Sequence, residues 1–183
     1  MMNIWHDIDP DRIKPDVFTA VIEISKGSKV KYELDKEVGL LRMDRILYTS
    51  THYPANYGFI PRTYADDLDP LDVLVLSSEV IMPMSLVECY PIGVIIMEDG
   101  GYLDEKIIAV PSGDPTYNQY NRIEALPSHI ATEMTHFFSV YKALEGKSTA
   151  IDRVQGVDEA ERIIEKCIEV YRRKFSTRTG RRF

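Results

Sequence analysis

The sequence has few of the features that mark secreted, membrane-spanning or metal-thiolate proteins. It has two cysteines, Cys89 and Cys167, which lie far apart and follow no metal-binding spacing, so neither a disulfide scaffold nor a cysteine-based zinc site is indicated. No apolar run approaches the roughly 18 residues of a membrane span, and the first 16 residues lack the apolar stretch of a signal peptide. These absences predict a soluble cytoplasmic protein with no membrane partner.

Basic residues are also outnumbered by acidic ones. The chain has 22 Lys and Arg against 29 Asp and Glu, a net charge of -7. A general nucleic-acid binder would carry a basic excess, so we expect no nucleic-acid partner. The four histidines show no zinc-binding spacing such as H-E-x-x-H, which favours packed or surface roles for them.

The length of 183 residues predicts a single domain over residues 1–183. Residues 1 to about 16 read as a short N-terminal extension, and about 176–183 as a basic C-terminal tail. The hydrophobic fraction of 44% is enough for an ordinary folded core.

The patterning places strands first and helices after. Short segments rich in Val, Ile and Leu, separated by turn sequences, predict strands. They lie at 18–24, 29–34, 40–47, 72–76, 91–97 and 106–111. Helical spacing then predicts one helix from an N-cap at Ser128 to a stop at Gly146, and a second from a capping box of Asp158 and Glu161. This order indicates an α+β domain, mainly β, built on a small barrel or sandwich.

Two acidic turns are the main candidates for chemistry. The segment "DLDPLD" supplies Asp67, Asp69 and Asp72 just before a strand, and "DGGYLD" supplies Asp99 and Asp104 between two strands. Carboxylates about 4 Å apart repel by roughly 4 kcal/mol at an effective dielectric near 20, so they must spread into water, take up protons or share a cation. If the strands are neighbours, both turns open at one end of the barrel and suit Mg²⁺ or Mn²⁺.

Cations and tyrosines accompany the acids. Lys31, Arg45, Lys106 and Lys142 each have an ordinary interpretation as surface charge, and the loop "YPANYGFIP" at 53–61 reads first as a packed loop. A ring of cations around an acidic metal site is explained by an anionic ligand, and phosphate fits because Arg, Lys and Mg²⁺ all bind its oxygens.

Taken together, "KYELDKEVG", "DR", "YPANYGFIP", "DxDPxDVLV", "D-x4-D-x-K" and "HFF-x2-YK" resemble the soluble family I inorganic pyrophosphatases. The resemblance implies an OB-like five-stranded β-barrel with flanking C-terminal helices. It implies hydrolysis of inorganic pyrophosphate (diphosphate) to two phosphates by a metal-activated water, with several Mg²⁺ per active site and Mn²⁺ as a substitute. It also implies a homo-oligomer, a hexamer if bacterial-type, with a dimer or trimer as the other options.

The resemblance also assigns roles. Metal ligation falls to Asp67, Asp72, Asp99 and Asp104, and Asp69 is the catalytic base. The residues implied to bind substrate phosphates are Lys31, Arg45, Tyr57, Lys106, Tyr141 and Lys142. Glu23, Glu33 and Tyr53 are implied to support the site. Two positions depart from the common pattern: Leu68 stands where the family often has glycine, and Gly100 where many bacterial members have an acid.

Three other functions compete with this interpretation. The acidic turns also suit a metal-dependent hydrolase of other phosphoanhydrides, although no base-binding feature is visible. A non-catalytic OB-like binding module would need a basic, aromatic groove. A structural protein would leave the acids merely solvated.

Overall fold

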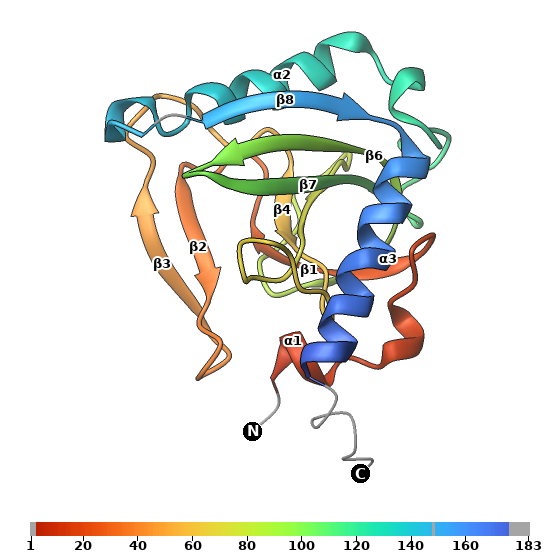
Figure 1. Ribbon diagram of the computed structural model, residues 1–183. Helices are drawn as coiled ribbons and strands as arrows, with labels where there is room; N and C mark the ends of the chain where they lie inside the picture. Colours follow the sequence, from red (N-terminus) through yellow and green to blue (C-terminus); the bar gives the residue numbers. More distant parts are fainter. Residues whose placement is uncertain (1–2, 148, 176–183) are drawn as a thin grey trace.

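The computed structural model describes residues 3–147 and 149–175. Five strands form a closed barrel, because β1 pairs with β4 on one side and with β6 on the other. In order around the barrel they are β1 (Phe18–Ile24), β4 (Asn56–Phe59), β5 (Asp72–Val75), β7 (Tyr102–Pro111) and β6 (Leu86–Asp99). The expected OB-like five-stranded barrel of an α+β fold is therefore confirmed (Figure 1).

Three further strands lie outside the barrel. β8 (Thr149–Gln155) extends the sheet by pairing antiparallel with β6. β2 (Val30–Leu34) and β3 (Leu41–Ile46) form a separate two-stranded sheet beside it (Figure 1). This two-stranded sheet is joined to the barrel where the Leu34 amide donates a 2.7 Å hydrogen bond to Glu23 Oε1.

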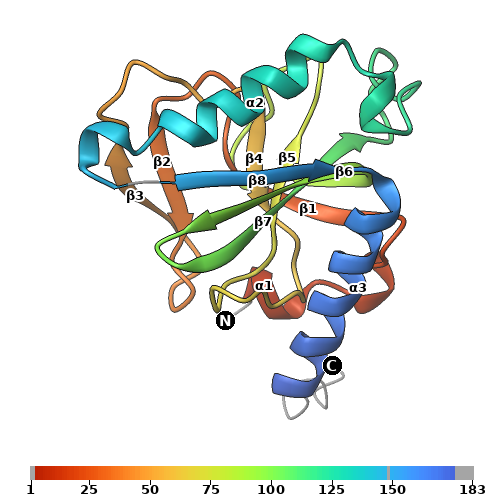
Figure 2. The same ribbon diagram turned by 45° about the horizontal axis from the view of Figure 1, so that its top comes forward.

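Two helices cover different sides of the barrel (Figure 2). α2 (Ser128–Val140) lies beside β8 and buries Met134, Phe137 and Phe138 against one part of the core. α3 (Val157–Lys174) packs on β6 through an apolar face of Ala160, Ile163, Ile164, Cys167 and Ile168. Both cysteines are buried free thiols.

The short elements complete the chain. α1 (Ile4–Asp7) packs against the far end of α3, where His6 Nδ1 lies 2.7 Å from the Tyr171 hydroxyl. Three 3-10 turns follow in the sequence, at Pro10–Arg12 (η1), Ile123–Ala125 (η2) and Ala143–Glu145 (η3). No helix within the described ranges is long and apolar enough to cross a membrane. The basic tail expected at 176–183 lies outside the described residues.

The expected helix ends need correction. Ser128 is the first residue of α2 rather than its N-cap, which is Pro127. α2 ends at Val140, and Gly146, with φ 69°, ends η3 instead. The predicted capping box is also wrong, because the N-cap of α3 is Gly156, which makes no side-chain hydrogen bond. Asp158 lies in the first turn instead, where its negative charge interacts favourably with the positive end of the helix dipole.

Two strands were not predicted. The segment expected to be a packed loop contains β4, whose Gly58 sits so close to β1 that a Cβ would lie 1.8 Å from the Val21 carbonyl oxygen. Asn and Gly in this segment hide the strand pattern. β8 is an edge strand whose exposed charged residues, Asp152 and Arg153 among them, weaken its apolar signal.

Candidate active site

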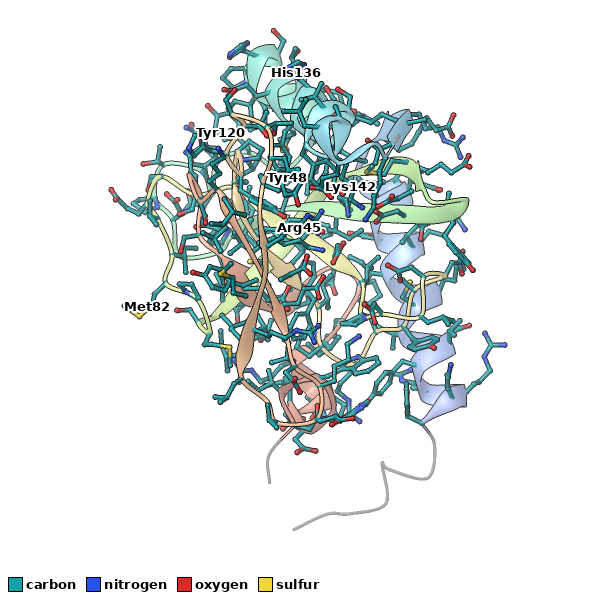
Figure 3. All side chains as sticks on the ribbon, turned by 90° about the vertical axis from the view of Figure 1, so that its left-hand side faces the viewer. Arg45, Tyr48, Met82, Tyr120, His136 and Lys142 are labelled. Atoms are coloured by element: carbon teal, nitrogen blue, oxygen red, sulfur yellow. The ribbon has the colours of Figure 1, made fainter. Side chains whose placement is uncertain are left out.

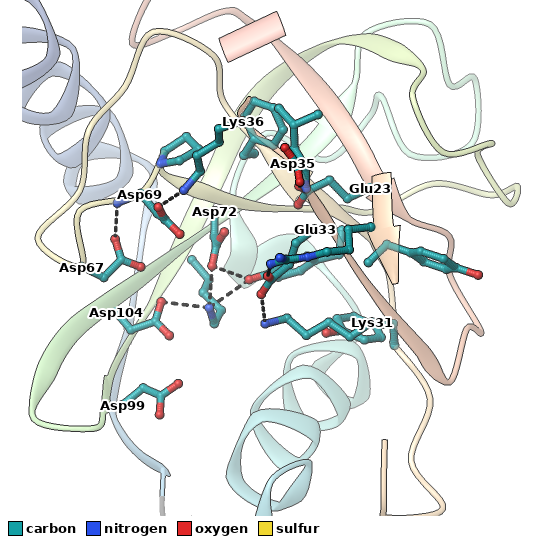
Figure 4. A pocket seen from close by; sticks show the side chains of 18 of the residues that line it. Glu23, Lys31, Glu33, Asp35, Lys36, Asp67, Asp69, Asp72, Asp99 and Asp104 are labelled. Carbon is teal, nitrogen blue, oxygen red and sulfur yellow. Dashed lines mark hydrogen bonds and ion pairs between the residues drawn. The ribbon is translucent and has the colours of Figure 1, made fainter. Parts of the chain in front are cut away.

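A cavity of about 510 Å³ lies at one end of the barrel. Every residue that the family resemblance implies for the site, except Arg45, lines this cavity (Figure 4). These are Glu23, Lys31, Glu33, Tyr53, Tyr57, Asp67, Asp69, Asp72, Asp99, Asp104, Lys106, Tyr141 and Lys142. The lining also includes Asp35, Lys36, Glu37 and Arg42, for which no role was expected.

The pairing of β5 with β7 brings the two acidic turns together. These strands run parallel, with Asp72 opposite Lys106, so their starting ends open on the same side. Asp104 lies two residues before Lys106, and Asp99 ends β6 across the hairpin. Asp67 and Asp69 occupy the loop that leads into β5. The expectation that both turns open at one end of the barrel is confirmed.

Lys106 occupies the floor of the cavity, with its side chain only 3% exposed. Its Nζ lies 2.8 Å from Asp72 Oδ2, 2.8 Å from Asp104 Oδ1 and 3.0 Å from the Tyr57 hydroxyl. Burial opposes the ammonium charge, but the carboxylates of Asp104 and Asp72 outweigh it and raise the pKa of Lys106 well above its usual value. Lys106 is therefore a permanent cation between two acids.

The tyrosines form the wall next to Lys106. The Tyr57 hydroxyl donates to Asp72, and its ring lies 5.3 Å from that of Tyr53 between centroids. Burial raises the pKa of Tyr53, Tyr57 and Tyr141, with the negative charge of Asp72 adding to the effect on Tyr57. All three phenols stay protonated and can donate hydrogen bonds to an anion.

Two carboxyl groups show that negative charge is concentrated here. Burial, with the charge of Asp72 adding to it, raises the pKa of Glu23 to about 8. Partial desolvation and the neighbouring Asp72 raise the pKa of Asp67 to about 6. Both shifts are in the direction that a nearby cation would reverse.

The two-stranded sheet supplies the opposite wall. Lys31 Nζ lies 2.6 Å from Glu33 Oε1, as expected for side chains on one face of a strand. Arg45, opposite Lys31 in register, is drawn away from the cavity lining: its Nε donates to Glu145 Oε1 at 2.9 Å and its Nη1 pairs with Asp44. Figure 3 shows Arg45 and Lys142 on the same side of the molecule.

The residues present suit a divalent metal. Five aspartates from two turns offer hard oxygen donors, which magnesium and manganese prefer over zinc. Within residues 3–147 and 149–175, no three His, Cys, Asp or Glu side chains form a ready ligand set. Lysines lie between the acids instead: Lys106 joins Asp72 to Asp104, and Lys142 pairs with Asp99. The five aspartates of the cavity carry more negative charge than Lys106 and Lys142 can neutralise, so further positive charge is needed there.

Comparison with known proteins decides the family. The model of the inorganic pyrophosphatase family matches residues 20–172. This chain belongs to the inorganic pyrophosphatase family. It is 45% identical over 174 residues to soluble inorganic pyrophosphatase 2 of Chlamydomonas reinhardtii, covering 95% of this chain and 91% of that protein. It is 47% identical over 167 residues to the soluble inorganic pyrophosphatase of Zea mays, covering 91% and 78%.

A solved structure agrees with these relatives. The inorganic pyrophosphatase of Helicobacter pylori superposes with a TM-score of 0.85 at 43% identity, covering 87% of this chain and 96% of that one. The resemblance inferred from the motifs is therefore confirmed, and membership in this family indicates a requirement for a divalent metal.

The two departures from the family pattern lie in backbone positions that favour glycine. Leu68 has φ 72°, which a leucine adopts only with strain, in the middle of the acidic loop. Gly100 has φ 60° at the tip of the β6–β7 hairpin, and a Cβ there would meet nothing within 4 Å. The first departure carries strain and the second leaves an open space beside Asp99.

Proposed function

We propose that this chain hydrolyses inorganic pyrophosphate to two phosphates with Mg²⁺ as its metal and Mn²⁺ as a substitute. One observation carries the proposal: five aspartates from two separate turns share one cavity with Lys31, Lys106 and Lys142. A highly charged anion with its accompanying cations would satisfy both sets of charge at once.

The metal would be held by Asp67, Asp72, Asp99 and Asp104, with Asp72 at the centre of the set. When bound, Mg²⁺ neutralises phosphate charge and acidifies water. Asp72 is suited to a central role because it already contacts both Lys106 and Tyr57. Its position at the start of a buried strand holds its backbone fixed.

The substrate phosphates would be bound by Lys31, Arg45, Tyr57, Lys106, Tyr141 and Lys142. Lysine and arginine provide charge-assisted hydrogen bonds to phosphate oxygens, and the buried phenols add neutral donors. To take part, Arg45 has to turn from Glu145 and Asp44 towards the cavity. Glu23, Glu33 and Tyr53 would support this set by fixing Leu34, Lys31 and Tyr57 respectively.

Asp69 would act as the general base. Its side chain is 55% exposed and lies at the cavity beside Asp72 and Asp67, where a water molecule can approach it (Figure 4). It would accept the proton as water attacks one phosphorus in line with the bridging oxygen, while Lys142 and Tyr141 hold the departing phosphate. Asp69→Asn is expected to lower kcat much more than it raises KM.

The test of the proposed activity is phosphate release. Purified protein should release phosphate from pyrophosphate with Mg²⁺, lose this activity with EDTA and regain it when excess Mg²⁺ is added. ATP and a phosphomonoester serve as comparison substrates. Faster release from either of them, or release that persists under chelation, would contradict the proposal.

We also propose that the chain forms a homo-oligomer in the cytoplasm. Large apolar side chains are exposed on the loop before β6, including Val80 at 64% and Met82 at 75% (Figure 3). A self-associating surface accounts for such exposure, and buried free thiols at Cys89 and Cys167 suit a reducing compartment. Sedimentation equilibrium distinguishes a hexamer from a trimer or dimer, and a monomer at micromolar concentration would overturn the proposal.

A further inference from the structure

Lys36 is a cavity residue to which neither the motifs nor the family resemblance gives a role. It lies in the turn between β2 and β3, and its ammonium pairs with Asp69 Oδ1 across 33 positions of sequence (Figure 4). The side chains are 38% and 55% exposed. An ion pair this exposed contributes only about 0–1 kcal/mol to stability, so stability alone does not account for the arrangement.

The backbone that carries Lys36 is held firmly. Asp35 Oδ1 accepts hydrogen bonds from the amides of Glu37 at 3.0 Å and Val38 at 3.1 Å. The Lys36 carbonyl accepts a 3.1 Å hydrogen bond from Asn3 Nδ2, which lies at the start of the N-terminal helix α1. The turn is therefore fixed both internally and from α1.

Trp5 of α1 connects Lys36 to the base of the acidic loop. Lys36 Nζ lies 5.3 Å from the centroid of the Trp5 ring, a cation–π contact. The indole Nε1 donates to the Thr63 carbonyl at 3.0 Å, and the Thr63 hydroxyl accepts from the Leu71 amide at 2.8 Å. Trp5 thus contacts both the Lys36 side chain and the segment that enters the acidic loop.

The carboxylate of Asp69 depends on this arrangement. Its backbone is fixed, because its carbonyl accepts from the Ala65 amide at 2.8 Å and its amide donates to Asp67 Oδ1 at 3.1 Å. Among the residues that the structure describes, Lys36 is the only hydrogen-bond partner of the Asp69 carboxylate. With Oδ1 held by Lys36, Oδ2 remains available to accept a proton.

We propose that Lys36 is a positioning residue for Asp69 and that α1 holds it in place through Asn3 and Trp5. The proposal rests on the role of Asp69 as general base. α1 lies before residue 20, where the match to the family model begins, so the support comes from outside the matched region. Misplacement of a catalytic group by about 1 Å can lower the rate up to 100-fold, which sets the scale of the effect.

The test compares two lysines that pair with aspartates of the same acidic loop, Lys36 with Asp69 and Lys166 with Asp66. Lys36→Gln is expected to lower kcat for pyrophosphate about tenfold with KM changed by less than about twofold, and Lys36→Arg to restore most of the loss. The matched control is Lys166→Gln, since Lys166 Nζ lies 3.2 Å from Asp66 Oδ2 on the outer side of the loop and its removal changes the charge equally. This control should keep wild-type kcat.

A double-mutant cycle shows whether Lys36 acts through Asp69. Lys36→Gln should add nothing to the effect of Asp69→Asn, whereas independent roles would give multiplied effects. A raised KM with unchanged kcat, equal losses in the two lysine variants, or multiplied effects would overturn the proposal. A slow Asp69→Asn beside a full-speed Lys36→Gln would overturn only the Lys36 role. Full-speed Asp69→Asn would overturn both roles while leaving the measured hydrolysis of pyrophosphate intact.

Fluorescence provides a readout independent of activity. Trp5 is the only tryptophan in the chain, so its emission reports the Lys36 contact directly. Lys36→Gln should shift the emission of the chelated protein, and Lys166→Gln should not. Identical spectra for wild type and Lys36→Gln would show that the contact is absent in solution and overturn the proposal.

Discussion

Lys106 and Asp72 face each other across the parallel strands β7 and β5, with Lys106 Nζ 2.8 Å from Asp72 Oδ2. The same ammonium lies 2.8 Å from Asp104 Oδ1. One buried cation therefore balances two acids that come from different turns. This ammonium offsets part of the repulsion between the acids at this end of the barrel.

Lys106→Met is expected to destabilise the chelated protein by about 3 kcal/mol, because Asp72 and Asp104 lose their buried counter-charge. Mg²⁺ should recover part of the loss by supplying charge at the same acids. Urea unfolding with and without Mg²⁺ measures both effects. Lys14→Met removes an exposed lysine and should change the free energy of unfolding little; an equal loss in both variants would contradict the role of Lys106.

Glu23 predicts a specific dependence of stability on pH. Its pKa is about 8 in the folded protein against a usual 4.5. The folded state therefore binds more protons than the unfolded state between these values, and the free energy of unfolding should fall as pH rises from about 4.5 to 8, by a few kcal/mol at most. Below about pH 4.5 both states are protonated and this contribution is constant.

Glu23→Gln should remove most of that slope in chelated protein and raise stability at pH 8. The glutamine oxygen can still accept the hydrogen bond from the Leu34 amide, so the change isolates the charge. Urea unfolding from pH 5 to 8 measures it. Glu37→Gln, at an exposed position of the β2–β3 turn, should leave the slope in place, and an unchanged slope in Glu23→Gln would exclude Glu23 as its source.

Replacing Leu68 by glycine is expected to preserve or raise stability, whereas most substitutions lower it. Leu68 is 61% exposed and has φ 72°, so replacement by glycine loses little burial and relieves backbone strain. Leu68→Gly should leave stability unchanged or raise it by up to about 1 kcal/mol, whereas Leu68→Val should lower it by about 1–2 kcal/mol. Thermal unfolding of the glycine and valine variants measures the difference. A Leu68→Val variant more stable than Leu68→Gly would contradict backbone strain at this position.

Gly58 is required by close packing of strands. A Cβ at this residue would lie 1.8 Å from the Val21 carbonyl oxygen, so Gly58→Ala should cost about 3 kcal/mol or prevent folding. Gly113→Ala is the control, since a Cβ there meets nothing within 4 Å. Circular dichroism melting compares them, and similar stabilities would show that β1 and β4 separate easily.

Local pattern predicted the strands that are buried and apolar, and it placed Asp99 and Asp104 with the other acidic turn because both flank such strands. β4 was not predicted because it is short and contains Asn and Gly, and β8 was not predicted because it is a charged edge strand; neither has that apolar pattern. Helix ends were misplaced because their caps are backbone features at Pro127 and Gly156.

The interactions that the sequence could not reveal join distant positions. Arg45 reaches Glu145 across 100 positions, and Lys36 reaches Asp69 across 33. No local periodicity encodes such a pair. They follow from the placement of the two-stranded sheet beside the barrel (Figure 1), which only the assembled fold defines.

The two walls of the cavity rest on supports of unequal stiffness. The aspartates stand on a closed barrel in which each strand is paired on both edges, whereas Lys31 and Glu33 stand on a two-stranded ribbon, a unit that is marginal by itself. Amides of the ribbon should therefore exchange with solvent sooner than those of the barrel. The ribbon wall is therefore expected to open locally before the barrel does, apart from its β2–β3 turn, which Asn3 of α1 ties in place.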